Sequence, residues 1–596
     1  MILTALAQYY DRLSERSDKV PAYGFSEEKI SYILVLSGEG DLVDIVPNLT
    51  ANKKTQPKLM RVPMPAKKSV NISPNFLWGN TQYVIGLTAK TIKPPRTVND
   101  YFESFKKLHL DKLHDCSESS LISFCNFLRK WDPCQIAGFS FPKGFEDKNV
   151  VFQIDGEKKY LHDLDESKAI WKNILTEMDE QSEHGICLVT GEKKPISRLH
   201  PSIKGVSGGQ SSGVSIISFK KGSFESYGKE QGENAPVSEH AAFAYTTALN
   251  YLLRRENNQS IGLGDTSIVF WAQADKSADA QQAESLFMNF FNPPYVSDES
   301  ETVLLQSEIE KLAKGRPLSE IAPDLDPKTQ FFILGLAPNA VRLSIRFWLQ
   351  TDFGHIQQRL AEHFQDLALD PLPWKTPPSI WRLLMQLAPH REGQKPKMED
   401  VPAHLAGELM RSILTGQRYP RAILAQVLVR FRADGDISGL RVALIKAVLQ
   451  REFRKQLTKE EIPMSLDESN TNAAYLLGRL FAVLENIQRI ALGDKVNATI
   501  ADKYYASAST VPYSVYPRLL SGSKHHLSKV RKDKPGLAFN LEKELGQIMS
   551  SLPTEFPRHF SIENQGRFSI GYYHQKNARF ATTSKDENEL TTEGEE

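Results

Sequence analysis

The sequence predicts an α+β protein, in which a mixed α/β N-terminal region is followed by a mainly α-helical C-terminal half that ends in a helical bundle. Short apolar runs bounded by turn residues, typical of strands, alternate with helical patterns in the first 275 residues. From about residue 300, apolar residues recur at spacings of three and four, which is the period of an amphipathic helix. A chain of 596 residues is also too long for one hydrophobic core, so we expect roughly two to four domains.

The N-terminal region, residues 1–275, is expected to begin with an amphipathic helix and to continue into a β-hairpin. The hairpin strands, 30–36 and 42–46, flank the turn-forming sequence Ser-Gly-Glu-Gly-Asp. We expect further strands at 83–87, 150–154 and 214–219, and helices at 99–109, 119–130, 166–178 and 238–253.

A linker is predicted over 276–302, where Asn-Pro-Pro is followed by an acidic stretch. A helical domain is expected over 303–463, with one helix starting at Pro338 because proline is favoured in a first helical turn. The apolar residues with helical spacing are Val341, Ile345 and Trp348, then Leu405, Leu409 and Ile413, then Ile423, Leu424, Val427 and Leu428.

Pro463 closes a helix and marks a second boundary, so residues 464–580 are predicted to form a C-terminal helical bundle. Its first long helix is expected to start around Asn470 and has a complete apolar face, which requires partner helices. We place those partners near 513–530, 537–550 and 568–580. The acidic end, residues 581–596, predicts a disordered tail.

Composition and charge exclude several classes of protein. The chain is 40% hydrophobic and 24% charged, as in globular proteins, and no stretch approaches the roughly 20 uninterrupted apolar residues of a membrane span. Four cysteines without C-x-x-C spacing fit a reducing compartment, so we expect a cytoplasmic protein. The net charge is only +1, but cations concentrate in two runs, 52–68 and 524–534.

The first basic run leads into a segment with the side chains that read duplex DNA. Cations bind phosphates, asparagine amides hydrogen-bond to base edges, and aromatic rings stack or wedge. Phe76 and Trp78 fit either a wedge or a hydrophobic core, and burial tendencies favour the core. The candidate residues of this site are Lys67, Lys68, Asn71 and Asn75.

The glycine-rich segment 205–213 is a second candidate site for DNA. Glycines let a backbone approach a ligand closely and turn its N–H groups toward a phosphate. A nucleotide-binding P-loop is excluded, because no Gly-Lys-Ser/Thr follows and the next element is predicted to be a strand. The residues of this site are Gly208, Gly209 and Gln210, and a flexible turn is the alternative.

Three further groups of polar side chains are candidates for DNA contact. The first precedes the helix expected at 238–253, the second lies on the helix expected from Pro338, where two arginines four apart share one face, and the third is the second basic run. The alternatives are a solvated loop and a surface face of salt bridges. The residues are Lys229, Gln231, Asn234, Arg342, Arg346, Lys524, Lys529, Arg531 and Lys532.

Catalytic patterns are weak, and we expect this chain to be no enzyme and to hold no metal or cofactor. A hydrolase would use Cys187 as nucleophile and His200 as base, but the sequence identifies no third group to orient them. His184, three residues before that cysteine, lacks a second pair of zinc ligands. The His-Asp pairs at 114–115 and 162–163 lack the further ligands that a two-metal nuclease requires.

Several segments taken together resemble the large subunit of the type I-C CRISPR Cascade complex, and their combination is more specific than any one of them. With the opening helix they span nearly the whole chain. The segments are Cys187-Leu-Val-Thr-Gly-Glu192, Leu199-His-Pro-Ser-Ile-Lys-Gly205, Ser226-Tyr-Gly-Lys-Glu-Gln231 with Asn234-Ala-Pro-Val-Ser238, Tyr475-Leu-Leu-Gly-Arg-Leu-Phe-Ala-Val-Leu-Glu485, and Gly571-Tyr-Tyr-His-Gln575.

The resemblance implies a subunit that inspects duplex DNA for the protospacer-adjacent motif, helps to open it for guide RNA pairing, and recruits a separate helicase-nuclease. The implied partners are crRNA-bound Cascade filament subunits, target double-stranded DNA, the helicase-nuclease and a small subunit. In this family the small subunit is generally made from within the large-subunit gene, and Met464 is the expected internal start. The alternative is a scaffold without nucleic-acid contact, which would need its basic segments buried or paired with acids.

Overall fold

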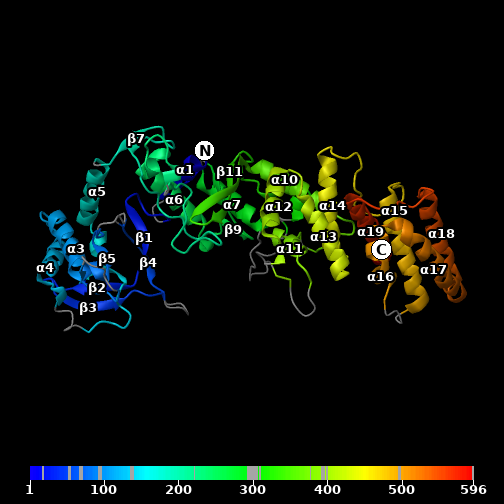
Figure 1. Cartoon of the computed structure of the whole chain (residues 1–596), viewed down its shortest axis with the longest axis horizontal. Coiled ribbons are helices and arrows are strands. Elements are labelled where there is room, and N and C mark those ends of the chain that lie inside the picture. Colours follow the sequence, from blue (N-terminus) through cyan, green and yellow to red (C-terminus); the bar gives the residue numbers. More distant parts are fainter. Residues whose placement is uncertain are drawn as a thin grey trace. The chain divides into compact units, whose positions relative to one another are not determined.

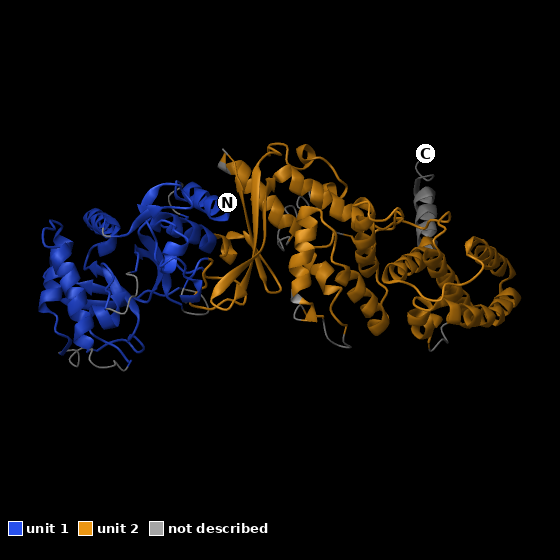
Figure 2. Ribbon diagram, turned by 45° about the horizontal axis from the view of Figure 1, so that its top comes forward, with its two compact units in different colours: residues 1–203, 217–251 blue, residues 204–216, 252–596 orange. Residues whose placement is uncertain are grey.

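The computed structural model divides the chain into two compact units. Unit 1 comprises residues 1–203 and 217–251, and unit 2 comprises residues 204–216 and 252–596 (Figure 2). This division does not coincide with the limits predicted at 275 and 463. Among the described residues, strands occur only before Phe353 and helices dominate beyond it, which confirms the α+β class (Figure 1). The described residues are 1–15, 19–50, 56–65, 72–90, 97–134, 140–180, 182–219, 222–274, 276–291, 307, 310–375, 377–390, 396–397, 400–493 and 498–592.

Unit 1 contains a four-stranded sheet, whose strands lie in the order β3 (Leu42–Pro47), β2 (Tyr32–Leu36), β6 (Asn149–Ile154) and β5 (Trp78–Asn80). The predicted hairpin is confirmed, since β2 and β3 pair antiparallel. The strand predicted at 150–154 is also confirmed as β6, which pairs parallel with β2. Helices α3 (Val98–Lys112) and α4 (Ser119–Lys130) pack against this sheet through the buried rings of Phe105, Phe124 and Phe152.

The helices predicted at 99–109, 119–130 and 166–178 are confirmed as α3, α4 and α5 (Asp165–Glu180). The strand predicted at 83–87 is wrong, because the short helix α2 (Thr81–Val84) occupies its start. Asn80 caps this helix, and its Oδ1 accepts a hydrogen bond from the Gln82 N–H at 3.1 Å. A polar cap therefore overrides the strand propensity of the apolar residues that follow.

The remaining elements of unit 1 join residues from both ends of its sequence. The opening helix, α1 (Ile2–Ser14), packs through Tyr10 against Phe243 of α6 (Glu239–Leu252), with ring centroids 5.6 Å apart. The predicted helix at 238–253 is therefore confirmed. Two antiparallel ribbons complete this unit: β1 (Phe25–Ile30) with β4 (Lys58–Pro63), and β7 (His184–Ile186) with β8 (Lys193–Pro195).

Unit 2 begins with an antiparallel sheet, whose strands lie in the order β12 (Arg342–Asp352), β11 (Gln330–Asn339), β10 (Thr266–Gln273) and β9 (Ser260–Leu263). The helix predicted from Pro338 is wrong, because this proline lies at the end of β11 and the following residues form β12. The residues Leu343, Ile345, Phe347 and Leu349 also recur at every second position, which is the period of a strand. Pairing with the apolar run of β11 decides between the two periods.

Two further predictions at the start of unit 2 are corrected by the structure. The strand predicted over 214–219 is absent from these described residues, which contribute only isolated bridge pairing at Val214 and Ser215. Within the predicted linker 276–302, residues Ser277–Phe291 form helix α7 instead. Ala283 and Phe287 of α7 are buried, because the helix packs against β10.

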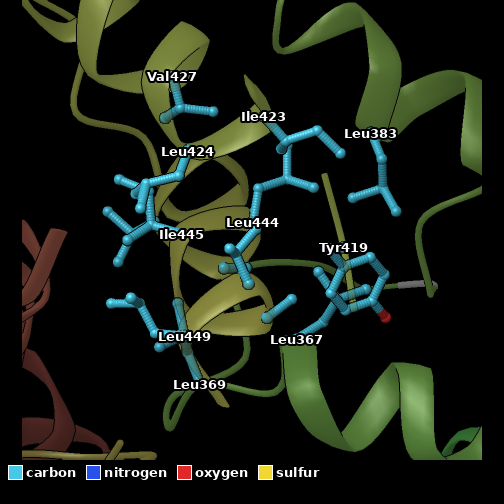
Figure 3. Packing of buried hydrophobic residues seen from close by; sticks show 14 of the residues in the cluster. Leu367, Leu369, Leu383, Tyr419, Ile423, Leu424, Val427, Leu444, Ile445 and Leu449 are labelled. Atoms are coloured by element: carbon cyan, nitrogen blue, oxygen red, sulfur yellow. The ribbon is translucent and has the colours of Figure 1, made fainter. Parts of the chain in front are cut away.

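Helices cover the rest of unit 2 and share one hydrophobic core. The spacings that predicted helices at 405–413 and 423–428 are confirmed by α12 (Ala403–Thr415) and α13 (Arg421–Asp434). Leu424 of α13 and Ile445 of α14 (Gly439–Arg454) lie side by side in this core (Figure 3). The shorter helices of this region are α9 (Leu318–Ile321) and α11 (Ile380–Met385).

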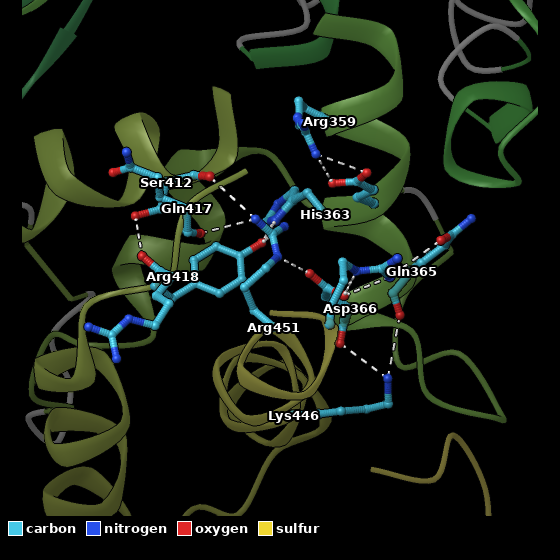
Figure 4. A network of polar contacts seen from close by, with 12 residues as sticks. Arg359, His363, Gln365, Asp366, Ser412, Gln417, Arg418, Lys446 and Arg451 are labelled. Carbon is cyan, nitrogen blue, oxygen red and sulfur yellow. Dashed lines mark hydrogen bonds and ion pairs between the residues drawn. The ribbon is translucent and has the colours of Figure 1, made fainter. Parts of the chain in front are cut away.

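A buried polar network joins α14 to α10 (Phe353–Leu367) (Figure 4). The fully buried Asp366 carboxylate accepts hydrogen bonds from Arg451 Nε at 2.5 Å and from Arg454 Nη2 at 2.9 Å. Tyr419 also accepts a hydrogen bond from Arg451 Nη2 and lies 2.6 Å from His363 Nδ1. Burial, and then the Arg451 charge, lower the pKa of His363 to about 3, so its ring is neutral.

The C-terminal residues form the predicted bundle of helices: α15 (Ala473–Leu492), α16 (Ile500–Ala508), α17 (Pro512–Asp533), α18 (Pro535–Ser551) and α19 (Ile562–Thr592). The long α15 is capped by Asn472, whose Oδ1 accepts the Ala474 N–H at 2.9 Å. Its central residues are buried on nearly every face, because α17, α18 and α19 surround it. This core is continuous with that of α13 and α14, so the segment from residue 464 is not a separate compact unit.

Helix α19 is assigned as far as Thr592, but its side chains beyond Ala578 lie outside the described residues, so the disordered tail at 581–596 stays a prediction. The sequence after Gly571 contains neither glycine nor proline as far as Thr592, so nothing in the backbone interrupts the hydrogen-bond ladder. Residues 593–596 lie outside the described residues.

Candidate nucleic-acid interface

The glycine-rich segment 205–213 forms a tight loop on unit 2. The Gly209 N–H donates a hydrogen bond to the Val206 carbonyl oxygen at 3.0 Å, and Gly208 has a φ of +72° in the left-handed region that favours glycine. Val206 is buried and anchors the loop, whereas Gln210 is exposed. The loop thus presents backbone and short polar side chains to solvent.

This glycine loop runs beside the turn between β11 and β12. The Ser215 N–H donates to the Val341 carbonyl oxygen at 3.2 Å, and the Leu343 N–H donates to the Ser215 carbonyl oxygen at 2.9 Å. These bonds pair Ser215 with Arg342 in a short parallel bridge. The structure therefore brings two predicted site segments, more than a hundred residues apart in sequence, to one end of the sheet.

The two predicted arginines of this region do not share a helix face. Both lie on β12, where residues four apart are separated by about 13 Å, roughly twice their spacing on a helix. The Arg346 guanidinium also forms an ion pair with Asp265, with Nη2 and Oδ2 2.9 Å apart. Of the two arginines, Arg342 is the one that the bridge to Ser215 holds beside the glycine loop.

Only part of the N-terminal basic site lies within the described residues. Lys67, Lys68 and Asn71 are outside them, while Asn75 is described and half-buried. On β4, the Arg61 Nε lies 3.8 Å from a Glu27 carboxylate oxygen of β1, so an acid from another strand faces the acid-free run.

The aromatic residues next to this site belong to the core of unit 1. Phe76 stacks on His109 and Trp171, with ring centroids 5.5 and 5.7 Å apart. The Trp78 Nε1 donates a hydrogen bond to the Pro63 carbonyl oxygen at 2.8 Å, and both aromatic side chains are buried. The core interpretation of Phe76 and Trp78 is therefore confirmed.

Residues 222–234 form a polar loop on unit 1 that contains three predicted site residues. The Asn234 side chain holds the loop together, since its Oδ1 accepts the Ser226 N–H at 3.0 Å and its Nδ2 donates to the Lys229 carbonyl oxygen at 2.9 Å. The Gln231 Oε1 accepts a hydrogen bond from Arg198 Nε at 2.9 Å. These two amides shape the loop, and Lys229 is left exposed on it.

Tyr227 lies in the same loop and is 100% exposed, but it was not among the predicted site residues. A large aromatic side chain with its whole surface in water is uncommon in a folded protein. The available signal was an aromatic residue between serine and glycine in an otherwise polar stretch.

The second basic run lies on α17, which spans the helix predicted near 513–530. Its four predicted cations, Lys524, Lys529, Arg531 and Lys532, are all exposed. Arg531 forms an ion pair with Glu542 of α18. Burial lowers the pKa of His526, and His525 and Lys529 lower it further, as expected in a positive local field.

The groups considered for hydrolase chemistry are each engaged elsewhere. The buried Cys187 Sγ accepts hydrogen bonds from the Ser238 and Val189 N–H groups at 3.2 and 3.4 Å. Burial raises its pKa, but the hydrogen bonds from Ser238 and Thr190 outweigh burial and lower the pKa to about 7. The His200 Nδ1 lies 2.7 Å from the Tyr245 hydroxyl. Cys187 thus has the geometry of a cap at the start of α6.

The structure also bears on metals and membranes. Within the described ranges, no three His, Cys, Asp or Glu side chains are grouped closely enough to hold a metal ion. In the same ranges, no helix combines the length and the apolar character needed to cross a membrane.

Comparison with known proteins agrees with the sequence resemblance. The family model described as CRISPR-associated protein (Cas_Csd1) matches residues 6–580. No curated protein matches the chain. Because the family match covers nearly the whole chain, the protein belongs to the Cas_Csd1 family of CRISPR-associated proteins, the large subunits of type I-C Cascade.

Proposed function

We propose that this large subunit recognises the protospacer-adjacent motif in duplex DNA, helps to open the duplex for guide RNA pairing, and recruits the helicase-nuclease. The observation that carries the proposal is the glycine loop beside Arg342, since an exposed backbone next to a cation suits close approach to phosphates. In this proposal the chain cuts nothing itself and needs no cofactor.

We assign base-edge contacts to the N-terminal site. Asn71 and Asn75 would read the motif, while Lys67 and Lys68 would bind phosphates irrespective of sequence. In the assembled complex, replacing both lysines by alanine should weaken binding to every duplex and flatten its salt dependence. Asn71→Ala should instead relax the preference among motifs by about 1 to 3 kcal/mol. Unchanged binding in both variants would refute the assignment.

The glycine loop is assigned to the point where the DNA strands part. A Cβ at Gly209 would lie 3.1 Å from the Val206 carbonyl oxygen, so Gly209→Val tests bulk but also stresses the loop itself. Gln210→Ala adds no bulk and should slow strand separation without affecting folding. Gly38→Val is the matched control, because a Cβ there meets no described atom within 4 Å. If both loop variants separate the strands at the wild-type rate, the glycine loop is an ordinary turn without a role in opening the duplex.

The cations of α17 are proposed to bind the backbone of displaced or guide-paired DNA. Lys524, Lys529 and Lys532 are exposed, which a scaffold without nucleic-acid contact would not require.

The same region is proposed to exist separately as the small subunit, started at Met464. This methionine is 51% exposed in the segment between α14 and α15, and its carbonyl oxygen accepts the Asp370 N–H at 2.9 Å. Made alone, the segment would contain α15 to α19 and would expose the face of α19 that packs on α13 and α14 in the full chain.

A further inference from the structure

Tyr227 lies at the tip of a tight turn with an unusual backbone. The Lys229 N–H donates to the Ser226 carbonyl oxygen at 3.1 Å, which closes a four-residue turn around Tyr227 and Gly228. Both central residues have positive φ, +56° and +68°. The first position of such a turn favours glycine, asparagine or aspartate, because a larger side chain strains this backbone. A tyrosine there is held against its own conformational preference.

The rest of the loop maintains this strained conformation. The Gly232 N–H donates to the Arg198 carbonyl oxygen at 3.2 Å, and a Cβ at Gly232 would lie 2.1 Å from the Ser197 carbonyl oxygen. The loop therefore sits directly on residues 197–198, and the Asn234 hydrogen bonds described above close its other side. Tyr227 is thus displayed by an ordered turn and not by a loose chain.

The charges around the turn favour a nucleic acid as its ligand. Two of its acids are held by the loop's own backbone: Glu225 accepts the Gln231 N–H at 3.4 Å, and Glu233 accepts the Glu230 N–H at 3.0 Å. The third acid, Glu230, is exposed, and its carboxylate lies 4.0 Å from Arg198 Nη2. Lys229 is exposed, two residues from the exposed ring. Phe224, 41% exposed, is a second aromatic residue of the same loop. Aromatic rings beside a cation are the composition of single-strand binding sites, where bases stack on the rings and cations hold the phosphates.

We propose that Tyr227 is a stacking residue for an unpaired nucleobase, with Lys229 binding the adjoining phosphate. The inference rests on the proposed function, because an unpaired base becomes available only if the complex opens or holds a single strand. A base contact would account for the exposed ring and the strained backbone of Tyr227, neither of which stabilises the fold.

The test uses the assembled complex and fluorescence anisotropy with a labelled oligothymidine and an abasic oligonucleotide of the same length. Tyr227→Asn should weaken oligothymidine binding about 5- to 150-fold, the value of one stacked base, and leave the abasic strand unaffected. Tyr227→Phe keeps the ring and should bind as wild type. Lys229→Ala should weaken binding to both strands and reduce the salt dependence. Leu188→Ala, another exposed apolar residue of unit 1 at 68%, is the control.

The melting temperature distinguishes a folding defect from a binding defect. Asparagine suits the positive φ at this position, so Tyr227→Asn should leave the melting temperature unchanged or raised. Oligothymidine binding by Tyr227→Asn at wild-type affinity, or an equal loss on the abasic strand, overturns the stacking assignment. A wild-type complex that binds no DNA refutes the proposed function instead.

Discussion

Where α15 and α19 cross, the structure predicts that replacing a helix glycine by alanine lowers the stability of the fold, whereas helix propensity alone predicts an increase. Gly571 lies in the interior of α19, where alanine normally stabilises a helix by about 0.5 to 1 kcal/mol relative to glycine. Here a Cβ would lie 2.2 Å from the Tyr475 carbonyl oxygen of α15. From the other side, a Cβ at Gly478 would lie 2.0 Å from the Phe568 carbonyl oxygen. The two backbones therefore touch at these glycines.

Gly571→Ala forces the two helices apart by roughly 1 Å, because no flexible side chain can yield in place of the backbone carbonyl. That shift loosens the aromatic cluster at the crossing, where Phe481 lies 5.9 Å from Tyr572 and Tyr505 lies 5.5 Å from Phe568. We expect overpacking to exceed the gain in helix propensity and to destabilise the fold by about 1 to 3 kcal/mol.

Calorimetry of the full chain, together with hydrogen exchange of the α15 and α19 amides, measures this change locally and globally. Gly546→Ala on α18 is the matched control, since a Cβ there meets no described atom within 4 Å and should stabilise by up to about 1 kcal/mol. If Gly571→Ala proves as stable as Gly546→Ala, the close helix crossing is wrong.

Three further predictions follow from the structure. The free energy of unfolding should fall as the pH drops from about 6.5 toward 4, because His109, His363 and His574 are buried and neutral in the folded chain. Burial depresses their pKa values in the folded state, so only the unfolded chain takes up the proton, and each histidine contributes a loss of up to about 1.4 kcal/mol per pH unit. Urea midpoints at pH 7 and 5 measure this loss. Replacing Lys529 by alanine should lower the salt slope of DNA binding by about 1 in log–log titrations, whereas Arg531→Ala, whose charge is paired with Glu542, should lower it less. Mass spectrometry of the complex expressed from the intact gene should find a product of about 15 kDa, which corresponds to 133 of 596 residues of the 67.2-kDa chain. Met464→Leu should remove this product. If the filament assembles completely without it, the segment from residue 464 is only the C-terminal bundle of the large subunit and has no separate form.

Local signals in the sequence determined many of the elements. The hairpin at 30–46 follows from two apolar runs around a glycine turn, and the helices α12, α13 and α15 follow from apolar spacings of three and four. The family also follows from sequence, because its segments lie in order along nearly the whole chain. Each of these features depends on residues close together in the chain.

Only the tertiary structure decided features that depend on distant partners. The segment after Pro338 satisfies both the helical and the strand period, and pairing with β11 selects the strand. The same hairpin brings Arg342 to the glycine loop, and it separates Arg342 from Arg346 by the length of four strand residues. The exposure and the positive φ of Tyr227 came only from the structure, because neither can be read from residue type. Sequence thus determined which residues were available, and packing between distant segments determined which of them meet.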